Sequence, residues 1–275
     1  NVYVVSPEER WYGKRTEFSK ENGINILRIR TGNITKTNLI EKGISTLLIE
    51  KQFLNGIKRY FNNVKFDLII YSTPPVTFEK VVGYVKERDN AKSYLILKDI
   101  FPQNAVDLGL LKKGGIIHRY FRKKEISLYK LSDFIGCMSQ ANADYIISNN
   151  PFLKQVNIEV CPNSIEPVDI NVISKEEKNK IRENYSIPND AIVLIYGGNL
   201  GKPQGIDFLI SVLISNKNRA GIYFLITGSG TEYLKLKKHM DRTGYMNAKL
   251  YPYLSKEKYD ELVQACDIGM IFLDS

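Results

Sequence analysis

A glycine-rich segment, "GGNLGKPQG" at residues 197–205, is the part of the sequence best suited to hold an anionic group. It follows an apolar run, and a helix-like pattern begins at Gly205. Glycines let a ligand approach the backbone closely, and a helix N-terminus offers unpaired N–H groups with a partial positive charge. Lys202 would add a full charge. The segment predicts a phosphate-binding loop, and a glycine-rich turn without a ligand is the alternative that the residues leave open.

Two further loops follow the next apolar runs. One is Gly228-Ser229-Gly230-Thr231, and the other contains Tyr253 and Leu254. Because ligands of open α/β sheets bind outside the carboxyl ends of the strands, these loops are expected beside the first one. Tyr253 would offer an aromatic face to a flat base, although packing of its ring explains the residue equally well.

Two familiar phosphate-binding patterns fit this region poorly. A dinucleotide-binding loop is followed, about 20 residues later, by an acidic residue at the end of the next strand. Here Thr227 and Gly228 occupy that place. A Walker A loop ends in Gly-Lys-Ser/Thr, and this ending is absent. A nicotinamide-dependent oxidoreductase is therefore the weaker alternative, and a non-catalytic nucleotide- or sugar-binding module is another.

Polar residues also follow apolar runs in the first half of the chain. Lys98 and Asp99 end one run, and Ser72 and Thr73 end another. An acid at a strand end is placed to orient or deprotonate a hydroxyl group, so Asp99 is a candidate catalytic residue. Capping or bracing of a loop is the commoner role of such an Asp.

A basic amphipathic segment runs from residue 110 to residue 131. Its pattern is typical of a helix on an anionic membrane surface, and a solvated helix face is an equally good interpretation. His118, within it, is expected to be structural. The predicted membrane-surface residues are Lys112, Lys113, Arg119, Arg122, Lys123 and Lys124.

Short apolar runs that alternate with helix-like segments must position these residues. Such alternation predicts parallel sheets covered by helices on both faces. A length of 275 residues suggests two domains, and a polar, proline-containing stretch places the boundary near residue 166. We therefore expect an α/β protein of two Rossmann-like, doubly wound domains, 1–165 and 166–275, that face each other across a cleft.

Composition narrows the function classes. A hydrophobic share of 43% and a charged share of 25% exclude a disordered chain. No apolar stretch reaches the roughly 18 residues that span a membrane, and no signal pattern is present, so a cytoplasmic protein is expected. Three separated cysteines and two histidines indicate reduced thiols and no metal site. The net charge of +9 favours an anionic partner, but no nucleic-acid motif accompanies it.

The succession of motifs resembles the family 4 glycosyltransferases of the GT-B fold. It is most similar to bacterial members that assemble capsule, O-antigen and exopolysaccharide units, including fucosyl- and N-acetylfucosaminyltransferase-like enzymes. The resemblance covers nearly the whole chain in the family's order. The motifs that carry it are "FDLIIYSTPP", "LKDIFPQNAVDLGLL", "FIGCMSQ", "VCPNSIEP", "IYGGNLGKPQGIDFLI", "FLITGSG" and "YPYLSKEKYDELVQACDIGMIFL".

The resemblance implies a retaining transferase without cofactor or bound metal. The second domain would bind a nucleotide diphosphate sugar, and the first would bind the acceptor, expected to be a lipid-linked saccharide at the inner face of the cell membrane. The resemblance places Asp99 where the family keeps an acceptor-side polar residue, whereas Lys202 is inferred from its own charge in the glycine-rich loop; these two are the expected catalytic residues. Ser72, Thr73 and Lys98 would lie on the acceptor side. The implied donor-binding residues are Gly198, Asn199, Gly201, Gly228, Ser229, Gly230, Tyr253 and Leu254.

The sequence departs from the family pattern in two respects. Many members have Arg immediately after the glycine and Lys immediately before the later one, where this chain has Asn199 and Gln204. The family's donor-binding glutamates are expected beyond "DIGMIFLDS", and its first strand and helix before Asn1. The resemblance thus implies a chain truncated at both ends that folds without being active.

Overall fold

The computed structural model describes residues 1–35, 37–166 and 173–273. They form two compact units, Asn1–Ile165 and Glu166–Ser275. The division lies where the sequence analysis placed the domain boundary. Residues 167–172 of that boundary segment lie outside the described residues, as do Asp274 and Ser275 at the end of the last apolar run.

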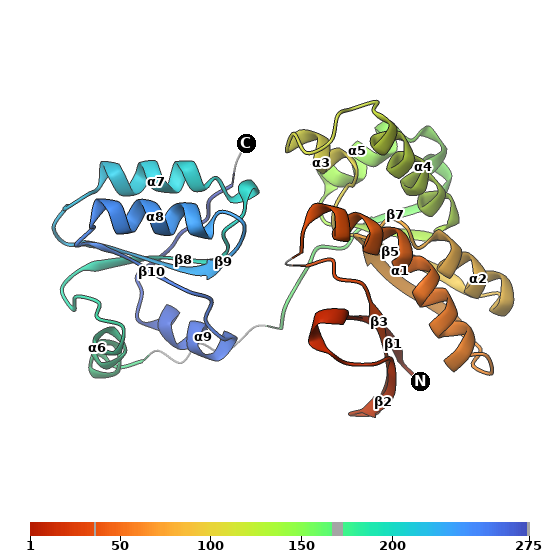
Figure 1. Cartoon of the computed structure of the whole chain (residues 1–275), viewed down its shortest axis with the longest axis horizontal. Coiled ribbons are helices and arrows are strands. Elements are labelled where there is room, and N and C mark those ends of the chain that lie inside the picture. Colours follow the sequence, from red (N-terminus) through yellow and green to blue (C-terminus); the bar gives the residue numbers. More distant parts are fainter. Residues whose placement is uncertain (36, 167–172, 274–275) are drawn as a thin grey trace. The chain divides into compact units, whose positions relative to one another are not determined.

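The first unit alternates strands with helices after an N-terminal hairpin (Figure 1). Its elements are β1 (Tyr3–Glu9), η1 (Arg10–Tyr12), β2 (Glu17–Glu21), β3 (Ile24–Thr31), α1 (Leu39–Tyr60), β4 (Leu68–Thr73), α2 (Glu79–Asp89), β5 (Lys92–Leu97), α3 (Gln103–Asp107), α4 (Ile116–Leu131), β6 (Phe134–Cys137), α5 (Gln140–Asn149), η2 (Pro151–Gln155) and β7 (Asn157–Val160).

The strands of the first unit form two sheets, whereas the alternation alone predicted one. β4, β5, β6 and β7 make a parallel sheet in that order. β1 and β2 flank β3 in a separate sheet, in which β2 is antiparallel to β3. The β2–β3 turn is Asn22-Gly23, both with positive φ, which is the favoured pair for a two-residue hairpin. The sequence analysis overlooked this signal.

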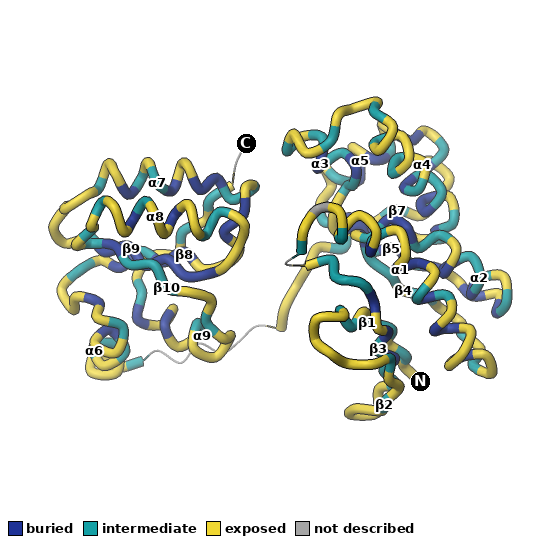
Figure 2. The backbone as a smooth tube through the Cα atoms, in the orientation of Figure 1, coloured by how far each residue is buried: buried dark blue, intermediate teal, exposed yellow. Residues whose placement is uncertain are grey.

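Both sheets of the first unit nevertheless share packing against α1 and α2. Leu27 and Ile29 lie two residues apart on the same face of β3. They point into one apolar cluster, which also contains Phe53 of α1 and Val81 of α2. Ile69 of β4 packs against the same cluster. Figure 2 shows buried positions where strands and helices of the unit face one another. Shared burial, without strand pairing between β1 and β4, therefore holds the first unit together.

The second unit is a parallel sheet with helices on both faces. The strand order is β10-β9-β8-β11, and all four strands are parallel. β9 and β10 lie on one side of β8 and β11 lies on the other, so the order of the strands along the sheet reverses at β8, as in half of a doubly wound fold. The elements are α6 (Lys175–Asn184), β8 (Ile192–Asn199), η3 (Lys202–Gln204), α7 (Ile206–Ser215), β9 (Ile222–Ser229), α8 (Tyr233–Thr243), β10 (Ala248–Tyr251), α9 (Lys256–Gln264) and β11 (Ile268–Gly269).

Side chains of β8 alternate between the two faces of this sheet. Val193 and Ile195 pack with Leu262 of α9, while Tyr196 packs with Leu209 of α7 on the other face. Period-two alternation of apolar residues is what a strand buried on both sides requires. Packing on both faces of the sheet therefore fixes the position of β8 and of the glycines at its end.

The three helices that follow strand ends in the second unit begin in different ways. The Ser255 hydroxyl accepts a hydrogen bond from the Lys258 N–H at the start of α9. Asp207 lies inside the first turn of α7, which begins after Gly205 in a left-handed conformation. Glu232, not Thr231, precedes α8. Of these three helices only α9 has a side-chain cap, and α7 and α8 start directly from the tight loops that follow β8 and β9.

Candidate functional site

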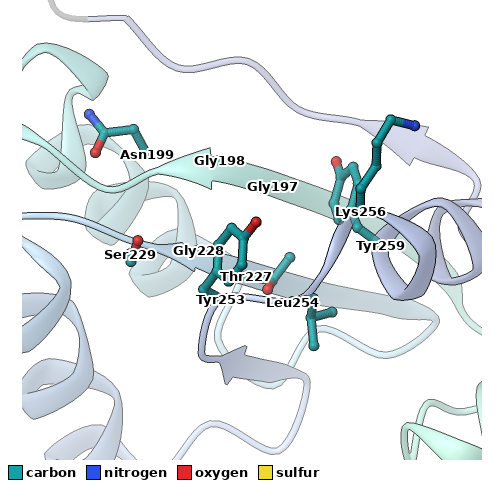
Figure 3. A pocket seen from close by; sticks show the side chains of 10 residues that line it. All are labelled: Gly197, Gly198, Asn199, Thr227, Gly228, Ser229, Tyr253, Leu254, Lys256 and Tyr259. Atoms are coloured by element: carbon teal, nitrogen blue, oxygen red, sulfur yellow. The ribbon is translucent and has the colours of Figure 1, made fainter. Parts of the chain in front are cut away.

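A cavity of about 380 Å³ lies at the carboxyl edge of the sheet in the second unit (Figure 3). The ends of β8 and β9, the loop after β10 and the first turn of α9 surround it. It is lined by Gly197, Gly198, Asn199, Thr227, Gly228, Ser229, Tyr253, Leu254, Lys256 and Tyr259. Six of the eight predicted donor-binding residues are therefore brought together here. Their role in binding stays a prediction.

The two glycine segments run side by side because β8 and β9 pair in parallel up to their ends. Gly198 lies opposite Gly228, and Asn199 lies opposite Ser229. A Cβ on Gly228 would overlap the carbonyl oxygen of Gly198. A Cβ on Gly198 would meet no atom within 4 Å, so its backbone is bare on the open side. Gly228 thus serves sheet packing, whereas Gly198 leaves room for a ligand.

The wall of the cavity near α9 is an aromatic ring. A Cβ on Gly197 would overlap the ring of Tyr259, so this glycine lets the ring lie directly on the backbone of β8. Burial raises the pKa of the Tyr259 hydroxyl, which stays neutral near pH 7. The sequence analysis missed Tyr259, although its place three residues after Lys256 in the first turn of a helix is the signal that would have found it.

The opposite wall is the loop after β10. The Thr227 hydroxyl donates a hydrogen bond to the Pro252 carbonyl at 2.8 Å and so ties this loop to the end of β9. The tie fixes the position of Tyr253, whose side chain is 71% exposed. Packing in the core therefore does not explain Tyr253, and its ring is accessible beside the cavity.

Lys256 is the one charged residue among the described residues that line the cavity. Its ammonium group lies 2.5 Å from a carboxylate oxygen of Asp260, one turn along α9. That hydrogen bond raises the pKa of Lys256, which keeps the ammonium protonated. The sequence analysis did not place Lys256 in the site.

Three predicted residues do not line the cavity: Gly201, Lys202 and Gly230. The Gly201 N–H donates to the Gln204 side-chain oxygen at 3.1 Å, so a neighbouring side chain satisfies an amide that was expected to meet phosphate. A Cβ on Gly230 would overlap the backbone of Leu200, so this glycine serves packing. Lys202 is exposed in η3. That the charge of Lys202 helps to bind phosphate stays a prediction, because Lys202 does not line the cavity.

The predicted acceptor-side residues lie together in the first unit, at the carboxyl ends of β4 and β5. The Thr73 hydroxyl donates to the Asp99 carbonyl oxygen at 3.1 Å and is buried, so it ties the two strand ends. Lys98 and Asp99 are exposed, and Ser72 is half-buried. The side chains of Lys98 and Asp99 are thus available for chemistry, while Thr73 has a structural role.

Within the basic segment, residues 116–131 form α4 and Lys112 and Lys113 precede it, and two cations of α4 have structural partners. Arg122 pairs with buried Glu125 at 2.6 Å, and Lys124 pairs with Glu79 at 2.5 Å. Lys112, Lys113, Arg119 and Lys123 are exposed. His118 accepts the Gly114 N–H at 3.3 Å, a local role of the kind expected. None of the described helices combines the length and apolar character needed to cross a bilayer.

The cysteines and possible metal ligands add no second centre in the described part of the chain. All three thiols are free, and burial raises the pKa of Cys137 to about 11, so it stays protonated. No three His, Cys, Asp or Glu side chains of the described residues lie close enough together to hold a metal ion.

Comparison with known proteins gives concordant matches. Residues 177–271 match the family described as Glycosyl transferases group 1. Two curated relatives are similar: "Probable glycosyltransferase WbjE" of Pseudomonas aeruginosa is 23% identical over 245 residues, and "Putative colanic acid biosynthesis glycosyl transferase WcaI" of Escherichia coli (strain K12) is 21% identical over 209 residues. The chain spans 58% and 51% of their lengths, while the alignments cover 87% and 75% of the chain.

Solved structures support the same architecture. The structure described as "Trehalose-6-phosphate from E. coli bound with UDP-2-fluoro glucose" aligns with 98% of this chain, and the chain covers 71% of that protein. The TM-score is 0.67 at 10% sequence identity, a likeness of fold alone. Two Rossmann-like α/β units of the GT-B type, the predicted fold class, are thereby confirmed.

Proposed function

We propose, from the match of residues 177–271 to the group 1 glycosyltransferases, that this chain binds a nucleotide diphosphate sugar and that the full-length protein transfers the sugar to an acceptor hydroxyl. The observation that carries the proposal is the cavity at the carboxyl ends of β8 and β9, where bare backbone, an accessible tyrosine and a lysine meet. This edge of a parallel sheet is where open α/β folds bind nucleotides.

Each wall of the cavity suits one part of such a donor. The open backbone at Gly198 and the ammonium group of Lys256 suit the diphosphate, because phosphate oxygens accept charge-assisted hydrogen bonds. The exposed ring of Tyr253 suits the flat base. As the bond to the sugar breaks, negative charge grows on the diphosphate, and donors already in place stabilise that charge.

The acceptor half of the proposal rests on the first unit. We propose that Lys98 and Asp99 approach the acceptor hydroxyl, that transfer retains the anomeric configuration, and that neither a cofactor nor a metal takes part. The leaving phosphate would take the acceptor's proton. A lipid-linked saccharide in surface polysaccharide synthesis is the proposed acceptor, supported by the name of the colanic acid relative. A hexose or deoxyhexose is the proposed transferred sugar, and the exposed cations of α4 are the proposed contact with an acidic membrane surface.

The oxidoreductase alternative lacks the residue that it requires. A dinucleotide-binding site holds the ribose hydroxyls with a carboxylate at the end of the second strand. Thr227 and Ser229 end β9 here, and none of the described lining residues is acidic. The cavity is therefore better suited to a donor whose ribose is held by other groups.

Calorimetric titration tests donor binding directly. We expect UDP-glucose or a GDP-sugar to bind the chain more tightly than NAD. Removing the ring with Tyr253→Ala should weaken that binding by about tenfold, since base stacking contributes roughly 1–3 kcal/mol. Tyr12→Ala is the matched control, because it removes an exposed tyrosine from the first unit. Preference for NAD, or equal binding by wild type and Tyr253→Ala, would contradict the proposal.

A further inference from the structure

A second cavity, of about 570 Å³, lies within the first unit between the end of β3 and the first half of α1. Gly32 allows this close approach, because a Cβ there would overlap the hydroxyl of Ser45 on α1. None of the residues predicted from the sequence belongs to this cavity. It is lined by Arg10, Arg30, Thr31, Gly32, Asn38, Ile40, Glu41, Ile44, Ser45, Leu48 and Gln52.

Two buried oxygens of the lining lack hydrogen-bond partners among the described residues. Thr31 is only 2% exposed, and its hydroxyl oxygen has no partner. The side-chain oxygen of Gln52 is likewise buried and unsatisfied. Buried polar atoms are almost always paired, since an unpaired one costs free energy. Because both residues line the cavity, a ligand that donates and accepts hydrogen bonds there would satisfy them.

The charges of the cavity favour an anion. Arg30 is exposed and has no ion pair among the described residues, and Arg10 lies 3.6 Å from Glu41. Hydrogen bonds from Thr37 and Asn33 lower the pKa of Glu41. Neighbouring protein groups therefore already stabilise the negative charge of Glu41. Two arginines thus line the cavity together with one carboxylate that already accepts hydrogen bonds from Asn33 and Thr37. The positive end of the 22-residue helix α1 adds to this field.

Apolar side chains border the same cavity on one face of α1. Ile40, Ile44 and Leu48 are 78%, 55% and 47% exposed, and they follow one another at helical spacing. Trp11 and Tyr12, next to Arg10 in η1, are 48% and 63% exposed. Exposed aliphatic and aromatic residues beside arginines are typical of surfaces that meet lipid headgroups.

We propose that this cavity binds the phosphate group of a membrane lipid. Arg10 and Arg30 would bind the phosphate oxygens, Thr31 would hydrogen-bond to the headgroup, and Ile40, Ile44 and Leu48 would contact the acyl region. The inference goes beyond the proposed transfer reaction and does not depend on it, because the two cavities share no residue and binding requires no sugar donor.

Vesicle binding by the whole chain tests the proposal. Wild-type protein should cosediment with phosphatidylcholine vesicles that contain phosphatidic acid and not with phosphatidylcholine alone. Thr31→Val should weaken binding by about tenfold while leaving the melting temperature unchanged or higher, because it removes an unsatisfied buried hydroxyl without changing the side-chain volume much. Arg30→Gln should weaken binding at least as much.

Two matched variants separate the cavity from general charge. Lys20→Gln removes an exposed cation at the other end of the β2–β3 hairpin and should leave binding unchanged. Equal losses in Lys20→Gln and Arg30→Gln, or wild-type binding by Thr31→Val, would overturn the proposal. Loss in Lys123→Gln of α4 alone would transfer the membrane contact to that helix and overturn it too. Binding of glycerol phosphate without any binding to the vesicles would overturn the lipid source.

Discussion

At the scale of single residues, Asn199 and Gln204 change how the donor cavity can hold negative charge. The Gln204 side-chain oxygen accepts from both the Asn199 amide and the Gly201 N–H. The family resemblance leads one to expect Arg and Lys at these two positions. A neutral hydrogen-bonded pair closes the loop here, and Lys256 is the charged group of the described lining.

Lys256→Ala should therefore weaken binding of a nucleotide diphosphate sugar by about tenfold, the usual loss for one charge-assisted hydrogen bond. Calorimetric titration of this variant against Lys258→Ala provides the comparison, because Lys258 is exposed on the same helix outside the cavity. Equal affinities of the two variants would remove Lys256 from the site. The expectation for Lys202 is separate: in the full-length enzyme, Lys202→Ala should slow transfer strongly, and unchanged turnover would exclude Lys202 from the mechanism.

At the scale of elements, the pairing of β8 with β9 sets the shape of the donor cavity. The two strands stay in register from Ile192 and Ile222 to Asn199 and Ser229. Gly228 makes this possible, since any side chain there would strike the backbone of Gly198. The glycines of this loop are thus divided between sheet packing and an open ligand face.

Gly228→Ala should destabilise the second unit by about 2 kcal/mol or more, because overpacking against backbone adds to an unfavourable positive φ. Gly198→Ala is the matched control: its φ is also positive, at 151°, but the added Cβ meets no atom within 4 Å. The midpoint of urea unfolding should fall further for Gly228→Ala than for Gly198→Ala. The reverse order would show that the close approach is not what requires glycine.

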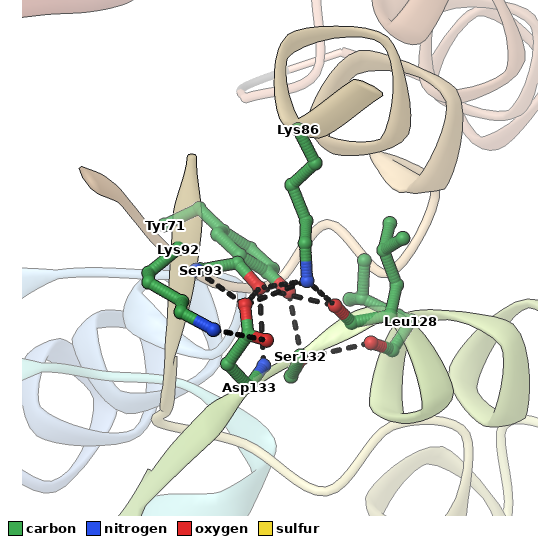
Figure 4. Close-up of polar contacts among 8 residues, drawn as sticks. Tyr71, Lys86, Lys92, Ser93, Leu128, Ser132 and Asp133 are labelled. Carbon is green, nitrogen blue, oxygen red and sulfur yellow. Dashed lines mark hydrogen bonds and ion pairs between the residues drawn. The ribbon is translucent and has the colours of Figure 1, made fainter. Parts of the chain in front are cut away.

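At the scale of the whole molecule, a partly buried carboxylate joins distant segments in each unit. In the first unit, Lys86 donates to Asp133 and Ser93 at 2.6 and 3.0 Å, as Figure 4 shows. In the second, Asp267 accepts from Arg182 at 2.8 Å and Lys178 at 2.6 Å. Desolvation raises the pKa of both carboxyl groups. The hydrogen bonds and the charges of their cationic partners together lower the pKa by a larger amount, so the pKa of each carboxyl group lies below its usual range.

A folded-state pKa below the unfolded value means that stability is present above the unfolded pKa, near 3.9, and is lost as pH falls through the folded one. Both units should therefore lose stability below about pH 4. Trp11, the single tryptophan, reports the first unit by fluorescence. Asp133→Asn should flatten the pH dependence of that transition, and Asp267→Asn should not. A wild-type midpoint that is constant from about pH 7 to pH 3 would contradict this assignment.

Local patterns in the sequence are enough to predict the strands and helices and the edge of the sheet at which a ligand would bind. Short apolar runs predicted the alternation of strands with helices, the basic amphipathic pattern predicted the helix that is α4, and glycines after apolar runs marked the ends of β8 and β9. These features depend on residues that are neighbours along the chain, where periodicity and turn chemistry act directly.

Only the tertiary structure decided which groups meet. It brought Lys256 and Tyr259 into the donor cavity, placed Lys202 and Gly230 outside it, and separated β1–β3 from the sheet of β4–β7. It also joined Arg10 and Thr31 to α1. These outcomes depend on strand register. They also depend on which backbone N–H groups already donate to a side chain, as the Gly201 N–H does to Gln204. Both are settled by packing between segments far apart in the chain, which no local pattern encodes.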